Sequence, residues 1–162
     1  MKRTILITSL LFVGLLSSIS TNAQESKFKA LFIYKFAEYI EWPGGSKDIT
    51  IGVAGKTDVY DELSAFAASK SNITVIKIGS PSDVSKCQIL FLPESQNALA
   101  GSYKSAVGNK SILIVSDEKS LVGPGSDIGF FTEGGKLRFK LSESNIKQKS
   151  MVASSKLLAL AN

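Results

Sequence analysis

Two short apolar runs constrain the fold of this chain most strongly. Cys87–Leu92 and Ser111–Ser116 are apolar at consecutive positions rather than at alternate ones. Strands of this kind are typical of a parallel sheet that is buried on both faces. Two further β-branched runs, Ile49–Ala54 and Ile73–Ile78, precede them, and helical patterns separate one run from the next. The sequence therefore predicts an α/β fold with a mainly parallel central sheet.

Helices and a hairpin are predicted around this sheet. Apolar residues recur at helical spacing in four segments: 28–42, 58–69, 95–107 and 143–161, the last capped by Ser142. Near the end of the chain, Asp127–Thr132 and Lys136–Leu141 flank a Gly-Gly turn, which is typical of an antiparallel hairpin. The complete expectation is a three-layer α/β sandwich with helices on both faces of the sheet and an antiparallel C-terminal hairpin.

The first helical segment carries apolar residues on more than one side. One side is a predicted core face and collects Phe28, Phe32, Phe36, Tyr39 and Ile40. Leu31, Tyr34 and Trp42 instead fall among charged residues. Such side chains either pack against a second helix or remain open for a partner. The helix is expected to end at Trp42, because the following Pro43 disfavours helical geometry there.

The N-terminus has the features of a secretory signal peptide. A basic start is followed by an apolar run over residues 5–16 and by small polar residues that end at Ala23. That run is shorter than the roughly 20 residues that a membrane-spanning helix requires. We therefore expect cleavage after Ala23, which makes residues 1–23 a removed leader and residues 24–162 a single exported α/β domain.

Charge and cysteine content exclude some partners and bonds. The net charge is +5, of which Lys2 and Arg3 in the leader supply two units, so the mature domain is too weakly basic to indicate nucleic-acid binding. Cys87 is the single cysteine and no internal disulfide can form. It could pair between chains or react, but its place at the start of an apolar strand favours an inert core thiol.

Catalytic and metal-binding motifs are missing from the sequence. The chain contains no histidine, which excludes Ser–His–Asp and Cys–His arrangements and removes the commonest zinc ligand. The segment Gly52–Thr57 imitates a phosphate-binding loop, but that motif needs its first glycine at position 50, which is a threonine. We therefore predict no catalytic residue, no metal site and no cofactor, and we do not expect an enzyme.

Three residues mark a candidate ligand site. Gly55 and Lys56 follow the first predicted strand, and Asp117 follows the fourth. Ligands in open α/β sheets usually bind at the carboxyl ends of the strands. These residues could therefore hold a small molecule, although Gly55 also suits an ordinary turn and Lys56 an ordinary solvated position.

The last predicted strand carries a basic row. Lys136, Arg138 and Lys140 alternate with apolar residues and so share one face of the strand. On an edge strand, such charges discourage aggregation between sheets. They could also bind an anion or an acidic partner, and both interpretations stay open.

Three stretches together resemble the YfiR-like periplasmic proteins. Lys29–Pro43 resembles the opening pattern K-A-x-F-x-Y-x-F-x-x-Y-x-x-W-P of that family. Cys87–Leu92 is similar to its cysteine-led central strand. Lys136–Leu141 and the segment Ser154–Ala161 are similar to its closing strand and its S-x-x-L-L-x-L-A helix. The matched stretches extend over nearly the whole predicted mature domain.

The resemblance implies a binding protein rather than an enzyme. Family members hold the outer part of a membrane-bound diguanylate cyclase inactive, are withdrawn by an outer-membrane-associated partner, and tend to dimerise. A histidine kinase could replace the cyclase as receptor. Well-studied members have disulfides, which Cys87 alone cannot form.

The sequence thus leaves two hypotheses about function. The first is docking on a receptor's extracytoplasmic domain through Tyr34, Trp42 and Arg138, with effects on cyclic di-GMP and biofilm. The rival hypothesis is a small-molecule binding module at Gly55, Lys56 and Asp117.

Overall fold

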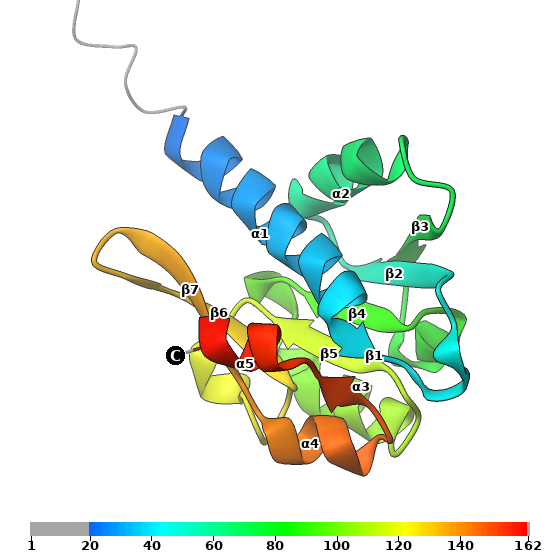
Figure 1. The fold of residues 1–162 in the computed structure, drawn as a ribbon. Coiled ribbons are helices and arrows are strands. Elements are labelled where there is room, and N and C mark those ends of the chain that lie inside the picture. The colour runs from blue at the N-terminus through cyan, green and yellow to red at the C-terminus, as the bar shows by residue number, and fades with distance from the viewer. Residues whose placement is uncertain (1–19, 162) are drawn as a thin grey trace, which may run out of the picture.

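The structure is a computed structural model that describes residues 20–161 and has the predicted three-layer architecture (Figure 1). The predicted leader, residues 1–23, lies outside the described residues except for its last four, which begin the first helix, so the leader stays a prediction. Among residues 20–161, no helix combines the length and the apolar character needed to cross a membrane.

Helices and short 3₁₀ segments alternate with the strands. The α-helices are α1 (Ser20–Tyr39), α2 (Val59–Ala67), α3 (Ala100–Val107), α4 (Glu143–Gln148) and α5 (Ser155–Leu160). The 3₁₀ helices are η1 (Pro43–Gly45), η2 (Pro81–Lys86), η3 (Glu94–Leu99) and η4 (Lys119–Leu121). The strands are β1 (Ile40–Glu41), β2 (Ile49–Ala54), β3 (Ile73–Ile78), β4 (Ile89–Leu92), β5 (Leu113–Ser116), β6 (Ile128–Glu133), β7 (Lys136–Leu141) and β8 (Val152–Ala153).

The central sheet has six strands in the order β3-β2-β4-β5-β6-β7. Neighbouring strands are parallel from β3 to β6, and only β7 runs antiparallel to its neighbour. Gly134 and Gly135 connect β6 to β7 with φ angles of 58° and 72°. Two successive residues with positive φ favour glycine and give the turn whose twist matches a hairpin. The predicted parallel sheet and C-terminal hairpin are therefore confirmed.

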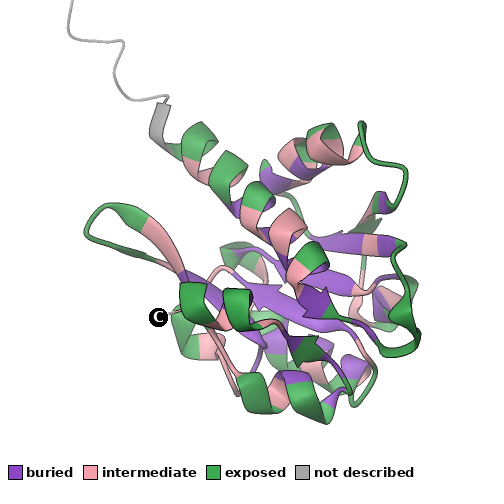
Figure 2. Ribbon diagram, in the orientation of Figure 1, coloured by how far each residue is buried: buried purple, intermediate pink, exposed green. Residues whose placement is uncertain are grey.

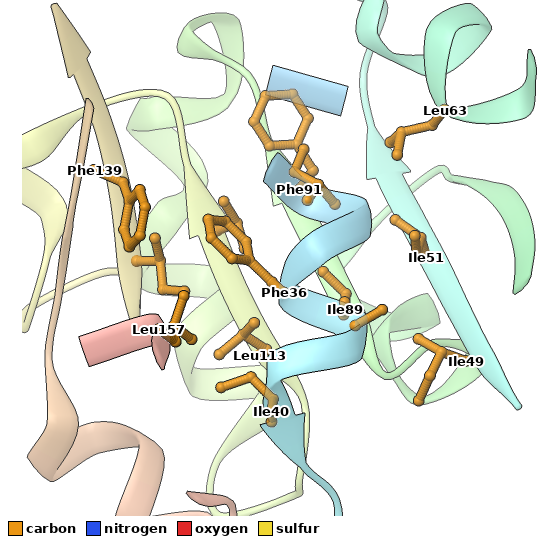
Figure 3. Close-up of a cluster of buried hydrophobic side chains, with 14 of the residues drawn as sticks. Phe36, Ile40, Ile49, Ile51, Leu63, Ile89, Phe91, Leu113, Phe139 and Leu157 are labelled. Carbon is orange, nitrogen blue, oxygen red and sulfur yellow. The ribbon is translucent and has the colours of Figure 1, made fainter. Parts of the chain in front are cut away.

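Each face of the sheet has its own helical layer. On one face, Phe36 of α1 and Ile40 of β1 pack over Ile89, Phe91 and Leu113, as the close-up in Figure 3 shows. α2 and α5 contribute to the same buried cluster. The opposite face is covered by α3 and η2. Figure 2 shows the strands between these layers as the most buried part of the molecule.

The first helix ends earlier than the sequence predicts. α1 stops at Tyr39 rather than at Trp42, because Ile40 and Glu41 leave the helix to form β1. β1 pairs antiparallel with β8 and makes a small second sheet. The backbone N–H of Ser154 also donates to the Tyr39 carbonyl at 2.9 Å. The prediction of a helix up to Trp42 was therefore wrong. Ile40 and Glu41, which were expected to form its last turn, pair instead with β8 from the other end of the chain.

The single helix predicted from Glu143 to Ala161 is also wrong. Ser142 caps a helix as expected, but that helix ends at Gln148. Lys149 then turns inward, where its ammonium lies 2.7 Å from the Asp127 carboxylate and donates to the Ile112 carbonyl. Burial lowers the pKa of Lys149 below its ordinary value, although the charge of Asp127 opposes the shift. The buried pair of Lys149 with Asp127 ends α4, and α5 is a separate helix that begins after β8.

Smaller differences concern the ends of elements. The helix predicted over 95–107 begins as the 3₁₀ helix η3 and becomes α-helical at Ala100. The strands predicted from Cys87 and Ser111 begin two residues later, at Ile89 and Leu113. β2, β3 and β7 have the predicted bounds.

Candidate functional site

The N-terminal half of α1 borders an apolar groove. Its lining includes Phe28 and Phe32 of α1 and Thr132, Lys136 and Leu137 of the β6–β7 hairpin, and its volume is about 500 Å³. We call this feature the apolar groove. In Figure 1 the tip of the hairpin projects from the body of the molecule, and Figure 2 shows that tip as exposed. The groove exists because α1 and the hairpin both extend beyond the edge of the packed core.

Phe28 is the most exposed aromatic side chain of the groove. It is 46% exposed, and Leu31, one turn further along α1, is 37% exposed. The sequence interpretation placed Phe28 on the core face, which is wrong. The helical spacing is as expected, but the sheet does not reach far enough to cover the first turns of α1. Neighbouring exposed apolar side chains of this kind are typical of a binding surface.

Two of the three proposed partner residues are largely covered. The ring of Tyr34 stacks on Phe66 of α2 at a centroid distance of 6.4 Å, and its hydroxyl donates to Glu38 at 2.8 Å. Trp42 is only 9% exposed, and its indole N–H donates to the Ala37 carbonyl. Both side chains line a depression of about 530 Å³ below α1. The expectation that Trp42 is displayed needs correction, and for Tyr34 the structure favours packing against a second helix.

Arg138, the third proposed partner residue, lies on the hairpin. β7 is the terminal strand of the sheet, as predicted, and Arg138 faces away from the core with a side chain that is 39% exposed. Its Nε lies 3.3 Å from Glu133 across the turn. Lys136 and Lys140 are exposed on the same strand. The structure therefore places Arg138 on the face of the hairpin opposite to Leu137 and the apolar groove, and separates it from Tyr34 and Trp42.

A second concave feature borders the same half of α1 and shares Glu25, Thr132 and Leu137 with the apolar groove. We call it the charged crevice and define it by Glu25, Lys29, Lys56, Glu94 and Asp117. It consists of two adjoining depressions, of about 510 and 260 Å³, which share Glu25, Lys29 and Glu94. The loops that follow β2, β4 and β5 form its floor, so the crevice is at the carboxyl edge of the sheet.

The three proposed ligand residues all reach this edge. Gly55 follows β2 with a φ of 67°, and a Cβ there would lie 2.8 Å from the amide nitrogen of Gln96. Glycine therefore lets the loops after β2 and β4 touch. Lys56 lines the larger depression and Asp117 the smaller one. The prediction that these residues share one edge of the sheet agrees with their positions, and their role in binding stays a prediction.

Lys29 connects α1 to this edge of the sheet. Its ammonium lies 2.8 Å from the Asp117 carboxylate and also pairs with Glu25 one turn back on α1. Lys29 is 9% exposed. Burial alone would lower its pKa, but hydrogen bonds to Asp117 and Glu25, together with their charges, hold the pKa of Lys29 above its ordinary value. The ammonium therefore stays charged and ties the first half of α1 to β5.

Sequence reasoning missed three residues of the crevice. Glu94 follows β4 after a single proline, so the argument that found Asp117 would have found it too. Glu25 and Lys29 carried no such signal, because their contribution depends on how α1 lies across the end of the sheet. Phe28 was noticed but was assigned to the wrong environment.

The described residues offer little catalytic chemistry. Burial raises the pKa of the Cys87 thiol to about 12, so the thiol is protonated at neutral pH and is a poor nucleophile. Within residues 20–161, no group of three or more acidic or cysteine side chains is arranged to hold a metal ion. The two concave features are therefore suited to binding, one to apolar groups and the other to charged ones.

Comparison with known proteins decides the family. Residues 26–162 match the YfiR/HmsC-like family (DUF4154). The chain belongs to this family. YfiR/HmsC-like proteins are periplasmic regulators of signalling, which agrees with the resemblance found in the sequence. No curated protein matches the chain.

A solved structure shares the fold. The crystal structure of a conserved domain protein from Vibrio cholerae O1 biovar El Tor strain N16961 has a TM-score of 0.61 to this chain at 10% sequence identity. The match covers 85% of this chain and 59% of the Vibrio chain. At this identity, the likeness of the YfiR/HmsC-like chain to the Vibrio protein is one of fold alone.

Proposed function

We propose that this YfiR/HmsC-like protein is a periplasmic regulator that docks on the extracytoplasmic domain of a membrane signalling receptor and holds the receptor inactive. A diguanylate cyclase is the first candidate receptor and a histidine kinase the second. An outer-membrane-associated protein is the proposed partner that withdraws the regulator. The mechanism is a population shift, in which binding favours the inactive arrangement of the receptor.

The observation that carries this proposal is the apolar groove in a member of a family of signalling regulators. Phe28 presents exposed aromatic surface in the groove that Leu137 also lines, and aromatic side chains often dominate binding energy at interfaces. Lys136 lines the same groove and forms no ion pair with another described residue. The groove therefore suits a receptor segment with an apolar anchor and acidic neighbours.

Arg138 stays in the proposed interface, whereas Tyr34 and Trp42 support it from behind. Arg138 adds a further cation on the exposed face of the hairpin. Tyr34 and Trp42 contribute mainly by fixing α1 against α2 and β1, because little of either side chain is open. A homodimer would be a competing occupant of the groove, and light scattering of the purified protein measures that directly.

Gene deletion and complementation test the proposal. Deleting the gene should raise cyclic di-GMP and biofilm, and the wild-type gene should restore both. The Phe28→Ser variant should fail to restore them. Leu99→Ser is the matched control, because Leu99 is 44% exposed but lies on η3, outside the groove. Both variants must reach the periplasm in equal amounts, as measured by immunoblotting.

The outcomes separate the candidate receptors. Unchanged cyclic di-GMP after deletion would contradict a cyclase receptor, and altered phosphorylation of a response regulator would then identify a kinase. If Phe28→Ser restores signalling as well as Leu99→Ser does, the groove is not the docking surface.

A second candidate function is a small-molecule binding module at the charged crevice. The observation that favours it is the convergence of charged side chains from α1 and from the loops after β2, β4 and β5 on two adjoining depressions. A ligand bound only by the folded state would raise the melting temperature as its concentration increases.

A further inference from the structure

The larger depression of the charged crevice lies at the topological switch point of the sheet. β2 and β4 are parallel neighbours in the middle of the sheet. The chain leaves β2 toward α2 on one face and leaves β4 toward α3 on the opposite face. Loops that diverge in this way leave an opening between them, and ligands of open α/β sheets bind there. The topology alone therefore selects this depression over the others.

Two opposite charges are available across this opening. Lys56 belongs to the loop after β2, and Glu94 begins η3 after β4. Within residues 20–161, neither side chain forms an ion pair or a hydrogen bond, and both are exposed. Lys29 differs from them, because its ammonium already pairs with both Glu25 and Asp117. Among the described residues that line this depression, Lys56 is therefore a cation without a partner and Glu94 an anion without one.

The remaining charged groups of the depression add acidic charge. Asp58 stands at the N-terminus of α2, where the helix dipole only partly offsets its charge, and Glu25 shares the single Lys29 ammonium with Asp117 of the adjoining depression. Thr57 accepts a hydrogen bond from the Val59 N–H through its hydroxyl. Ser26 of α1 contributes a neutral polar side chain to the opposite wall. It can hydrogen-bond to a ligand whose charged ends are already paired.

We propose that the charged crevice binds a small zwitterion, an amino acid or a short peptide with free ends, with its carboxylate at Lys56 and its ammonium at Glu94. A purely anionic ligand would meet Glu94 and a purely cationic one would meet Lys56, so a molecule carrying both charges is favoured over either. The volume of about 510 Å³ is within the range of small-ligand sites. The inference rests on the second candidate function and is independent of receptor docking.

Calorimetry with matched probes tests the proposal on protein expressed from the full sequence. The probes are the standard amino acids and alanyl-alanine, each up to 10 mM. Each amino acid is compared with its N-acetyl and its amide derivative, which lack one charge. At least one probe should bind, and loss of either charge should weaken its binding tenfold or more.

Variants assign the binding to the crevice. Lys56→Met and Glu94→Gln should each lower the affinity tenfold or more. Lys47→Met and Glu41→Gln are matched controls, because both residues are exposed and lie before β2, away from the carboxyl edge, so they should leave the affinity unchanged. No binding by any probe, equal binding of the derivatives that lack one charge, or unchanged affinity in both crevice variants would overturn the proposal.

The same variants separate this inference from receptor docking. Lys56→Met and Glu94→Gln keep the apolar groove intact, so they should still lower cyclic di-GMP when they complement the deletion strain. Loss of zwitterion binding with retained complementation supports two independent sites. Retained zwitterion binding in Phe28→Ser, together with failed complementation, places the receptor at the groove and the ligand elsewhere.

Discussion

The two halves of α1 have different roles. In the C-terminal half, Ile33 and Phe36 are 0% exposed. In the N-terminal half, Phe28 is 46% exposed. Both halves carry phenylalanine, but Phe36 is buried and Phe28 is not. The difference depends on what lies beneath them, because the second half crosses the centre of the sheet and the first half extends past its carboxyl edge.

The two halves are therefore held by different forces. The C-terminal half is fixed by apolar packing, which is distributed over many contacts. The N-terminal half is fixed by the ion pairs of Lys29 with Asp117 and Glu25. A helix built in this way can serve as core at one end and as binding surface at the other.

Removal of a core ring should have the largest effect. Phe36→Ala should lower the free energy of unfolding by about 3 to 5 kcal/mol, because it leaves a cavity among Phe130, Phe139 and Phe32. Urea denaturation followed by circular dichroism measures this. A loss below about 1 kcal/mol would contradict the assignment of this half of α1 to the core.

Loss of the Lys29 ammonium should have an intermediate effect. Lys29→Met should destabilise the protein by about 1 to 2 kcal/mol, because it leaves the Asp117 carboxylate without its partner. Hydrogen exchange should accelerate in residues 24–30 more than in residues 33–39. Lys35→Met is the control, since the exposed pair of Lys35 with Glu38 should contribute less than about 0.5 kcal/mol.

High pH should reduce the contribution of Lys29. Its pKa is raised above the ordinary 10.5 in the folded state, so the stabilisation is complete below 10.5 and is lost as the pH rises through the folded value. The difference in unfolding free energy between wild type and Lys29→Met should thus be constant from pH 7 to 10 and should narrow above 10.5. A difference that widens there would show that Lys29 does not stabilise through its charge.

Removal of the exposed ring should have the smallest effect on stability. Phe28→Ser should change the free energy of unfolding by less than about 0.5 kcal/mol, because the side chain makes few buried contacts. Thermal and urea denaturation measure this. A loss above about 2 kcal/mol would show that Phe28 belongs to the core and would remove the basis of the proposed docking surface.

Local patterns were sufficient to predict the sheet. β2, β3 and β7 have the predicted bounds, because β-branched and alternating residues specify strands within a short window. The break between α4 and α5 could not be predicted in this way. It depends on the pairing of Lys149 with Asp127, a residue 22 positions earlier in the chain. Long-range contacts of this kind leave no periodic signal.

The candidate sites, like the fold, could be predicted only where local sequence determines a residue's position. Residues that directly follow strands could be assigned to the carboxyl edge, as Gly55, Lys56 and Asp117 were. The contribution of Lys29 depends on the angle at which α1 crosses the sheet, which no residue pattern encodes. For the same reason, the exposure of Phe28 could not be foreseen from the periodicity of the helix.

The pairing of β1 with β8 links the two ends of the domain. Ile40 lies against Ala153, and the Leu157 side chain closes over the same core. This contact joins residues more than a hundred positions apart, and such non-local contacts form late in folding. The pairing of β1 with β8 and the packing of Leu157 therefore cannot form until the last residues of the domain have been synthesised and exported. Premature termination before β8, within the last dozen positions, would leave the six-stranded sheet nearly complete. β1, which directly follows α1, would then have no partner strand.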